Sequence, residues 1–123
     1  ICERHGIDLI SLIAPTSNDR ISMIAKEARG FVYVVSSLGV TGERSKITTD
    51  LGQIIKLVRE STDIPCAVGF GISTPKQAVE IGRLADGVII GSAIVKIIEK
   101  YGRDSVPYVE DYVRSIKSAL SSL

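Results

Sequence analysis

Short apolar runs alternate with longer segments of helical periodicity along most of the chain. The run from Asp8 to Ala14 is closed by Pro15, and the segment after it repeats apolar residues every three or four positions, as one face of a helix does. The same order returns three times, with apolar runs at 31–35, 65–68 and 87–90 before helical segments at about 50–60, 74–84 and 92–101. The pattern therefore predicts four strand–helix units in series.

The expected strands are apolar at nearly every position rather than at alternate ones. Such strands are typical of a parallel sheet that is buried on both faces and wrapped by helices. A last helix is expected from Val106 to Leu120, because Pro107 falls in its first turn, where a missing N–H costs least. The fold class is therefore α/β.

Composition narrows the classes of protein that remain. The 123 residues are 45% hydrophobic and 24% charged with a net charge of +1, which is typical of a globular chain and favours neither nucleic acid nor membrane as a partner. Without an apolar run of ~20 residues or a signal-like start, the expected location is cytoplasmic. Cys2 and Cys66 are far apart and have no metal-like spacing, so we expect reduced thiols and no metal site.

Two parallel-sheet folds compete, the doubly wound sheet and the TIM barrel. Gly69 and Gly71 would begin a dinucleotide-binding fingerprint, but Thr74 stands where the third glycine belongs. In TIM barrels a phosphate site is commonly built from the loops after the last two strands, and here both loops carry glycine, at Gly71 and at Gly91 before Ser92. The barrel is therefore favoured.

Glycine in these two loops has a chemical explanation and a purely structural one. Without a Cβ, the backbone N–H groups can approach anionic oxygens, and a helix that starts just beyond adds the positive end of its dipole. Ser92 would add a hydroxyl donor. For either loop alone, a tight turn explains the glycine equally well, but two such loops on neighbouring strands favour a phosphate site.

The segment from Ser36 to Thr49 is longer than the usual connection between a strand and a helix, and it is rich in glycine and hydroxyl groups. Either it is a tolerated surface insertion or it is a mobile lid over the site, and its place after a strand favours the lid. Thr41 and Gly42 are its expected working residues.

Several motifs together resemble one family, the alpha chain of tryptophan synthase. They are APT at 14–16, GFVY at 30–33, GVTG at 39–42, AVGFGIS at 67–73, ADGV at 85–88 and GSAIVK at 91–96. The resemblance implies a TIM barrel that cleaves indole-3-glycerol phosphate to indole and glyceraldehyde 3-phosphate. It also implies no cofactor of its own, with pyridoxal phosphate only in a partner beta chain, in an α2β2 complex.

The same resemblance assigns roles to individual residues. Tyr33, Thr41 and Phe70 match positions that line the substrate pocket, and the phosphate site is matched by Gly42, Gly71, Gly91 and Ser92.

Four units are half of a (β/α)₈ barrel, which typically takes ~250 residues. Residues 1–123 are therefore expected to form the C-terminal half of a single barrel domain, and Ile1 to Gly6 resembles the last turn of a preceding helix with Gly6 as its C-cap. The family's catalytic Glu and Asp belong to the other half, so no catalytic residue is expected here and the chain alone is predicted to be inactive.

Two alternatives remain open at this point. The chain is another phosphate-binding barrel, or it is a catalytically silent half-barrel module. A half-barrel exposes sheet edges and an apolar inner face, which another copy, a separate chain or the missing N-terminal half has to cover.

Overall fold

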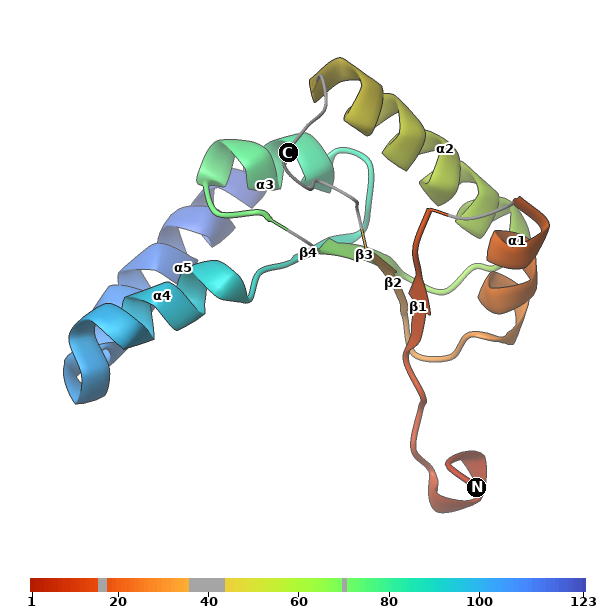
Figure 1. The fold of residues 1–123 in the computed structure, drawn as a ribbon, viewed down its shortest axis with the longest axis horizontal. Helices are drawn as coiled ribbons and strands as arrows, with labels where there is room; N and C mark the ends of the chain where they lie inside the picture. The colour runs from red at the N-terminus through yellow and green to blue at the C-terminus, as the bar shows by residue number, and fades with distance from the viewer. Residues whose placement is uncertain (16–17, 36–43, 70) are drawn as a thin grey trace.

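The computed structural model describes residues 1–15, 18–35, 44–69 and 71–123, and in them the chain forms one four-stranded parallel sheet. The strands are β1 (Ser11–Ile13), β2 (Val32–Val35), β3 (Cys66–Gly69) and β4 (Gly87–Ile89), and they lie side by side in chain order (Figure 1). This is the architecture that the four strand–helix units predicted. It leaves β1 and β4 as the two edge strands.

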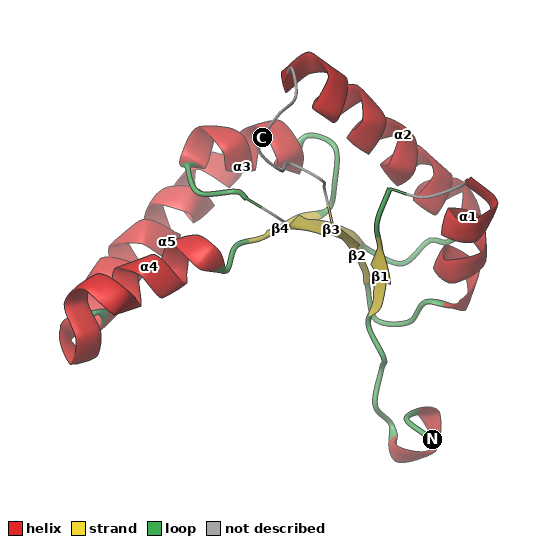
Figure 2. Cartoon of the chain, viewed as in Figure 1, coloured by secondary structure: helices red, strands yellow, loops and turns green. Residues whose placement is uncertain are grey.

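The described residues also form five α-helices. Figure 2 draws the helices in red. They are α1 (Asn18–Glu27), α2 (Arg44–Ser61), α3 (Pro75–Gly82), α4 (Ser92–Tyr101) and α5 (Val106–Leu120), and two 3₁₀ turns lie at Glu3–His5 and Gly102–Asp104. Helices α1, α2 and α3 lie on one side of the sheet, where they contact β1, β3 and β4 respectively (Figure 1). Helix α5 packs on α3 and α4.

The strand register divides the side chains into two faces. On the helix side, Ile13, Val34 and Val68 lie in one row and are fully buried in the core. On the other side, which we call the open face, Leu12, Tyr33 and Ala67 form one row, and Val35, Gly69 and Ile89 form the next. Leu12, in the middle of β1, is 58% exposed.

The open face agrees with the expectation that a half-barrel exposes an apolar inner face, and it differs from the burial on both faces that the strand pattern alone predicts. Strands that are apolar at nearly every position predict burial on both faces, whereas only the helix-facing side chains are fully buried. The physical reason is that the helices of the described residues pack on one side of the sheet.

The boundaries of the last helices agree with the prediction, but those of α2 do not. Helices α4 and α5 begin and end at the expected residues, and Pro107 lies in the first turn of α5. Helix α2 begins at Arg44 rather than near Asp50, so residues 44–49 of the expected lid are helical, and residues 36–43 lie outside the described residues. Ser45, Thr48 and Thr49 suggested a loop, but the apolar spacing of a helix extends back to Ile47.

The N-terminal segment has the local geometry that the sequence indicated. Gly6 ends the short 3₁₀ helix with φ 66°, and its N–H donates to the Glu3 carbonyl. This left-handed conformation is what a glycine C-cap provides.

Candidate functional site

The carboxyl ends of β2, β3 and β4 lie level at one edge of the sheet. Val35 is paired with Gly69, and Gly69 is paired with Ile89, each at the last position of its strand. The loops that follow β3 and β4 therefore leave the sheet next to one another. This edge contains every described residue to which the sequence assigned a binding role.

The loop after β4 ends in a helix start that has no side-chain cap. Gly91 is the N-cap of α4, and its carbonyl accepts from the N–H groups of Ile94 and Val95, at 2.9 and 3.1 Å. Among the described residues, nothing accepts from the N–H groups of Ser92 and Ala93. A Cβ on Gly91 would meet nothing within 4 Å, and Ser92 is exposed. The positive end of this helix is therefore open to an anion.

The loop after β3 also leads into a helix, but there nearby side chains accept from the backbone N–H groups at the helix start. Thr74 caps α3 in a capping box with Gln77, whose side-chain oxygen accepts from the N–H groups of Ser73 and Thr74 at 3.0 and 3.2 Å. The sequence analysis missed this, although Thr74 followed by Gln77 three positions later is the signature of the motif. Of the two helix starts, only that of α4 lacks such a cap.

Gly71 lies in the loop before this cap and has φ 69°, a left-handed conformation that favours glycine. The loop is also held by α5, because the hydroxyl of Tyr112 donates to the Ser73 carbonyl at 3.1 Å. Burial raises the pKa of Tyr112, so the phenol remains protonated as the donor. Gly71 is exposed in a loop that its neighbours fix.

Tyr33 lies on the open face and is half-buried. Its ring occupies the space beside Gly69, because a Cβ on residue 69 would lie 2.7 Å from Tyr33 Cε2 and 2.6 Å from the hydroxyl oxygen. The aromatic wall expected from the sequence is therefore present near the carboxyl end of β3. The other three predicted site residues, Thr41, Gly42 and Phe70, lie outside the described residues.

A structural cluster that the sequence analysis did not predict lies at the opposite end of the strands, where β3 and β4 begin. Asp86, just before β4, accepts from the Cys66 N–H at 2.8 Å and from Arg59 Nη2 at 3.2 Å. Burial, and secondarily the Asp86 carboxylate, raises the pKa of the Cys66 thiol to about 11, against the opposing effect of Arg59. Cys66 is thus a buried neutral thiol, as expected, and Asp86 faces away from the candidate site.

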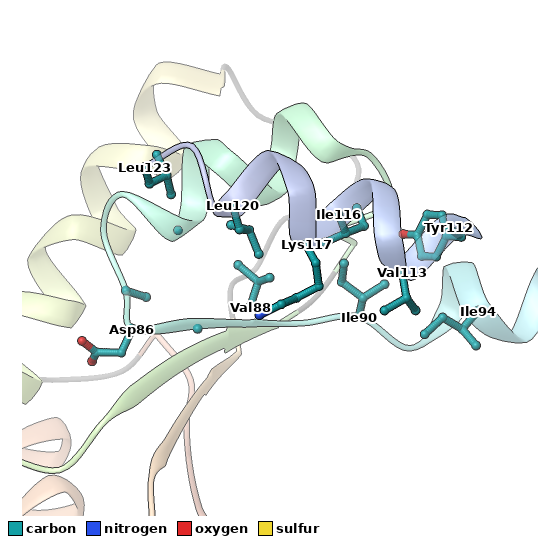
Figure 3. A pocket seen from close by; sticks show the side chains of 13 residues that line it. Asp86, Val88, Ile90, Ile94, Tyr112, Val113, Ile116, Lys117, Leu120 and Leu123 are labelled. Atoms are coloured by element: carbon teal, nitrogen blue, oxygen red, sulfur yellow. The ribbon is translucent and has the colours of Figure 1, made fainter. Parts of the chain in front are cut away.

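A cavity of about 560 Å³ lies between β4 and the helices α3 and α5, with Asp86 among its lining residues (Figure 3). Its wall is mainly apolar, with Val88, Ile116 and Leu120 among its side chains, and Lys117 extends from α5 towards β4. None of the predicted site residues lines it. The cavity lies beside β4, the last strand of the sheet, and is not part of the candidate site.

Two further findings concern metal ligands and membrane spans in the described residues. They contain no group of three or more His, Cys, Asp or Glu side chains that could hold a metal ion. In the same ranges, no helix is both long and apolar enough to cross a membrane.

Comparison with known sequences gives a consistent result. Residues 1–120 match the sequence model of the family described as "Tryptophan synthase alpha chain". The chain is 51% identical over 119 residues to the tryptophan synthase alpha chain of Lactiplantibacillus plantarum, which covers 96% of this chain and 45% of that protein. It is 46% identical over 122 residues to the alpha chain of Lacticaseibacillus casei, covering 99% and 46%. The chain thus spans about half the length of these relatives.

Solved structures agree with the sequence matches. The alpha subunit of tryptophan synthase from Campylobacter jejuni superposes with a TM-score of 0.80 at 36% identity, covering 90% of this chain and 44% of that one. A tryptophan synthase structure from M. tuberculosis gives 0.78 at 28% identity, covering 97% and 43%. The described fold is therefore that of about half of a TIM barrel.

Proposed function

The chain belongs to the tryptophan synthase alpha chain family, and from this premise we propose that it supplies the phosphate-binding half of an indole-3-glycerol-phosphate lyase. In this proposal residues 1–123 are the C-terminal half of one barrel domain. The complete enzyme releases indole and glyceraldehyde 3-phosphate, and a beta chain with pyridoxal phosphate receives the indole. The alternative of another phosphate-binding TIM barrel is not supported by the family match.

The observation that carries the proposal is the uncapped start of α4. The N–H groups of Ser92 and Ala93 point out of the helix at the carboxyl edge of the sheet, with open space above Gly91. A phosphate group fits this position because it accepts several hydrogen bonds and is attracted by the helix dipole. Gly71 and Gly42 complete the proposed phosphate site from the neighbouring loops.

The indole part of the substrate would lie deeper, against the open face. Tyr33 supplies one wall there, and Thr41 and Phe70 are the other proposed pocket residues. Retro-aldol cleavage needs groups that move protons at the indole carbon and at the glycerol hydroxyl. Asp8, Asp63 and Asp86 all precede strands, at the end of the sheet away from the site, and Glu43 lies outside the described residues. We therefore assign both carboxylates to the other half of the barrel, as the family resemblance implies.

A chimera tests this function directly. Residues 1–120 of this chain, which match the family model, would replace the corresponding segment of the Lactiplantibacillus plantarum alpha chain, and indole release from indole-3-glycerol phosphate would be measured with and without a beta chain. We expect activity close to that of the parent alpha chain. A folded chimera that binds neither substrate nor beta chain would contradict the proposal.

A further inference from the structure

Helix α5 packs on both of the helices that begin at the glycine loops. It contacts α3, which follows the loop of Gly71, and α4, which begins beside Gly91. None of the residues to which the sequence assigned a binding role lies on α5. The helix therefore contacts both sides of the proposed phosphate site and can set the distance between them.

The register of α5 on α3 is set near the C-terminal end of both helices. A Cβ on Gly82 would lie 2.7 Å from Leu120 Cδ2, so the glycine of α3 allows α5 to approach closely. Tyr112 lies about two helical turns before Leu120. Ser73 lies a similar distance before Gly82, just ahead of α3. Close contact at Gly82 therefore brings the Tyr112 hydroxyl to the start of α3.

The two peptide groups of Ser73 are held by different helices. The Tyr112 hydroxyl of α5 donates to the Ser73 carbonyl at 3.1 Å, and the Gln77 side-chain oxygen of α3 accepts from the Ser73 N–H at 3.0 Å. The preceding residue, Ile72, has its side chain in the core and is 4% exposed. The backbone that follows Gly71 is therefore fixed by the core, by α3 and by α5.

This arrangement leaves the N–H groups of Gly71 and Ile72 available. Within the part of the chain that the structure describes, no group accepts a hydrogen bond from either of them. A loop whose donors are already held in place loses less conformational entropy when it binds an anion. Fixing the loop therefore favours phosphate binding without adding any contact to the phosphate.

We propose that Tyr112 is a positioning residue of the phosphate site, which acts through its hydrogen bond to the Ser73 carbonyl. The hydroxyl ties α5 to the loop of Gly71, and the ring lines the same cavity as Ile90, the residue before Gly91 (Figure 3). The side chain therefore lies near both glycine loops. The inference rests on the proposed function, because it needs a phosphate group to bind there.

Two tyrosines of α5 offer a matched pair of variants. Tyr112→Phe removes only the hydroxyl and keeps the ring in the wall of the cavity, so the fold is retained. Tyr108→Phe removes the same group about one turn earlier on the helix. There the ring stacks on Tyr101, with centroids 3.6 Å apart, and the side chain is 45% exposed. The control thus changes α5 without changing the loop.

The test uses the chimera with the Lactiplantibacillus plantarum alpha chain, titrated with glycerol 3-phosphate and with indole. We expect Tyr112→Phe to weaken binding of glycerol 3-phosphate by about three- to tenfold, the range that one neutral hydrogen bond supports. Indole carries no phosphate, so its binding should not change. Tyr108→Phe should bind both ligands as the unsubstituted chimera does. Equal weakening of both ligands by Tyr112→Phe would show a general loss of structure and would overturn the inference.

Steady-state kinetics with indole-3-glycerol phosphate give a second readout. A residue that orders the loop equally in the substrate complex and in the transition state affects KM and leaves kcat unchanged. We expect this pattern for Tyr112→Phe. A lower kcat with an unchanged KM would contradict the positioning role.

Amide hydrogen exchange measures the order of the loop directly. Without ligand, the Ser73 amide should exchange faster in Tyr112→Phe than in Tyr108→Phe, because one of the two constraints on Ser73 is lost. A chimera with Tyr112 in place that binds no glycerol 3-phosphate would overturn the proposed function and this inference with it. A chimera that binds glycerol 3-phosphate equally well with and without the Tyr112 hydroxyl would overturn this inference alone.

Discussion

The phenol of Tyr33 occupies the space that a side chain at Gly69 would need. A Cβ on residue 69 would lie 2.6 Å from the Tyr33 hydroxyl oxygen and 2.9 Å from Ile89 Cβ, on the open face near the carboxyl end of β3. The glycine is therefore required by the close approach of neighbouring side chains, because the strand itself would accept any small apolar residue.

This contact predicts a compensating pair of substitutions. Gly69→Ala should lower the free energy of unfolding by about 1–3 kcal/mol, because the new methyl group overpacks the face. Tyr33→Leu removes the two nearest atoms, so the double variant should lose less than the sum of the single variants. Urea unfolding measures each value. Gly87→Ala on the same face is the control, since its Cβ would meet only Ala67 Cβ at the ordinary contact distance of 3.6 Å and the change should stay within roughly 0.5 kcal/mol.

Asp86 should stabilise the sheet through its hydrogen bond to the backbone more than through its ion pair. Asp86→Ala leaves the N–H of buried Cys66 without this acceptor and should cost about 1–3 kcal/mol. Arg59→Gln removes an ion pair whose side chains are about half exposed and a long 3.5 Å hydrogen bond to the Leu84 carbonyl, so it should cost about 1 kcal/mol or less. Asp86→Asn keeps an acceptor for the Cys66 N–H, so its loss of unfolding free energy should lie between those of Asp86→Ala and Arg59→Gln. Equal losses for Asp86→Ala and Arg59→Gln in urea unfolding would refute this assignment.

Cys66 should make stability depend on alkaline pH. Folding raises the pKa of its thiol from 9.0 to about 11, so the folded state favours the neutral form. The free energy of unfolding is therefore unaffected by this thiol below pH 9. It falls as the pH rises towards 11, by on the order of 2 kcal/mol in total, because the unfolded chain can ionise the thiol more easily. The readout is the difference in unfolding free energy between the chain and Cys66→Ala at each pH. A difference that does not change from pH 8 to about 11 would contradict the burial argument.

The phosphate site can be tested in the chimera with two substitutions in the loop after β3. Gly71→Val should abolish binding of a phosphate-bearing substrate analogue, because it adds a branched side chain at φ 69° where the backbone has to approach the oxygens. Gly71→Asn is the comparison, because asparagine adopts this φ more readily than valine. It therefore separates the effect of backbone strain from the effect of a side chain that blocks the phosphate. Isothermal titration measures the affinity. If a folded Gly71→Val chimera binds the analogue normally, Gly71 is only a turn residue.

Ser92→Ala in the same chimera should have a milder effect than Gly71→Val. One hydroxyl donor to a charged group is lost, which corresponds to ~1.5–3 kcal/mol of binding free energy, while the N–H groups at the start of α4 remain. Affinity for indole alone should not change, because indole carries no phosphate. Unchanged affinity for the phosphate-bearing analogue would remove Ser92 from the proposed site.

The chain without the other half of the barrel should release no indole from indole-3-glycerol phosphate. Positioned acid and base groups typically contribute ~10²–10⁴-fold to such a reaction, and the described acids that precede strands lie at the wrong edge. The measurement is indole formation by the purified chain, with the chimera as the positive control. Turnover by the chain at a rate near that of the chimera would show that a catalytic group lies within these 123 residues.

Much of the local structure was predictable because its causes are local. The bounds of α4 and α5 follow from apolar spacing and from Pro107, and the glycine C-cap at Gly6 follows from its place after a helical turn. The start of α2 was misjudged because hydroxyl residues at 45, 48 and 49 have weak helix propensity, which the apolar period outweighs. The capping box of Thr74 and Gln77 was readable in the sequence and was overlooked.

The sequence by itself determined four strand–helix units, their parallel sheet and the glycine loops at its carboxyl edge, because periodicity, caps and turns depend on neighbours in the chain. Only the tertiary structure decided that Tyr33 lies against Gly69, that Asp86 holds the Cys66 N–H, and that Leu12 is left exposed. These relationships join residues on different strands, and they depend on strand order, on register and on which face the helices cover. None of those quantities is encoded in the spacing of residues along a single segment.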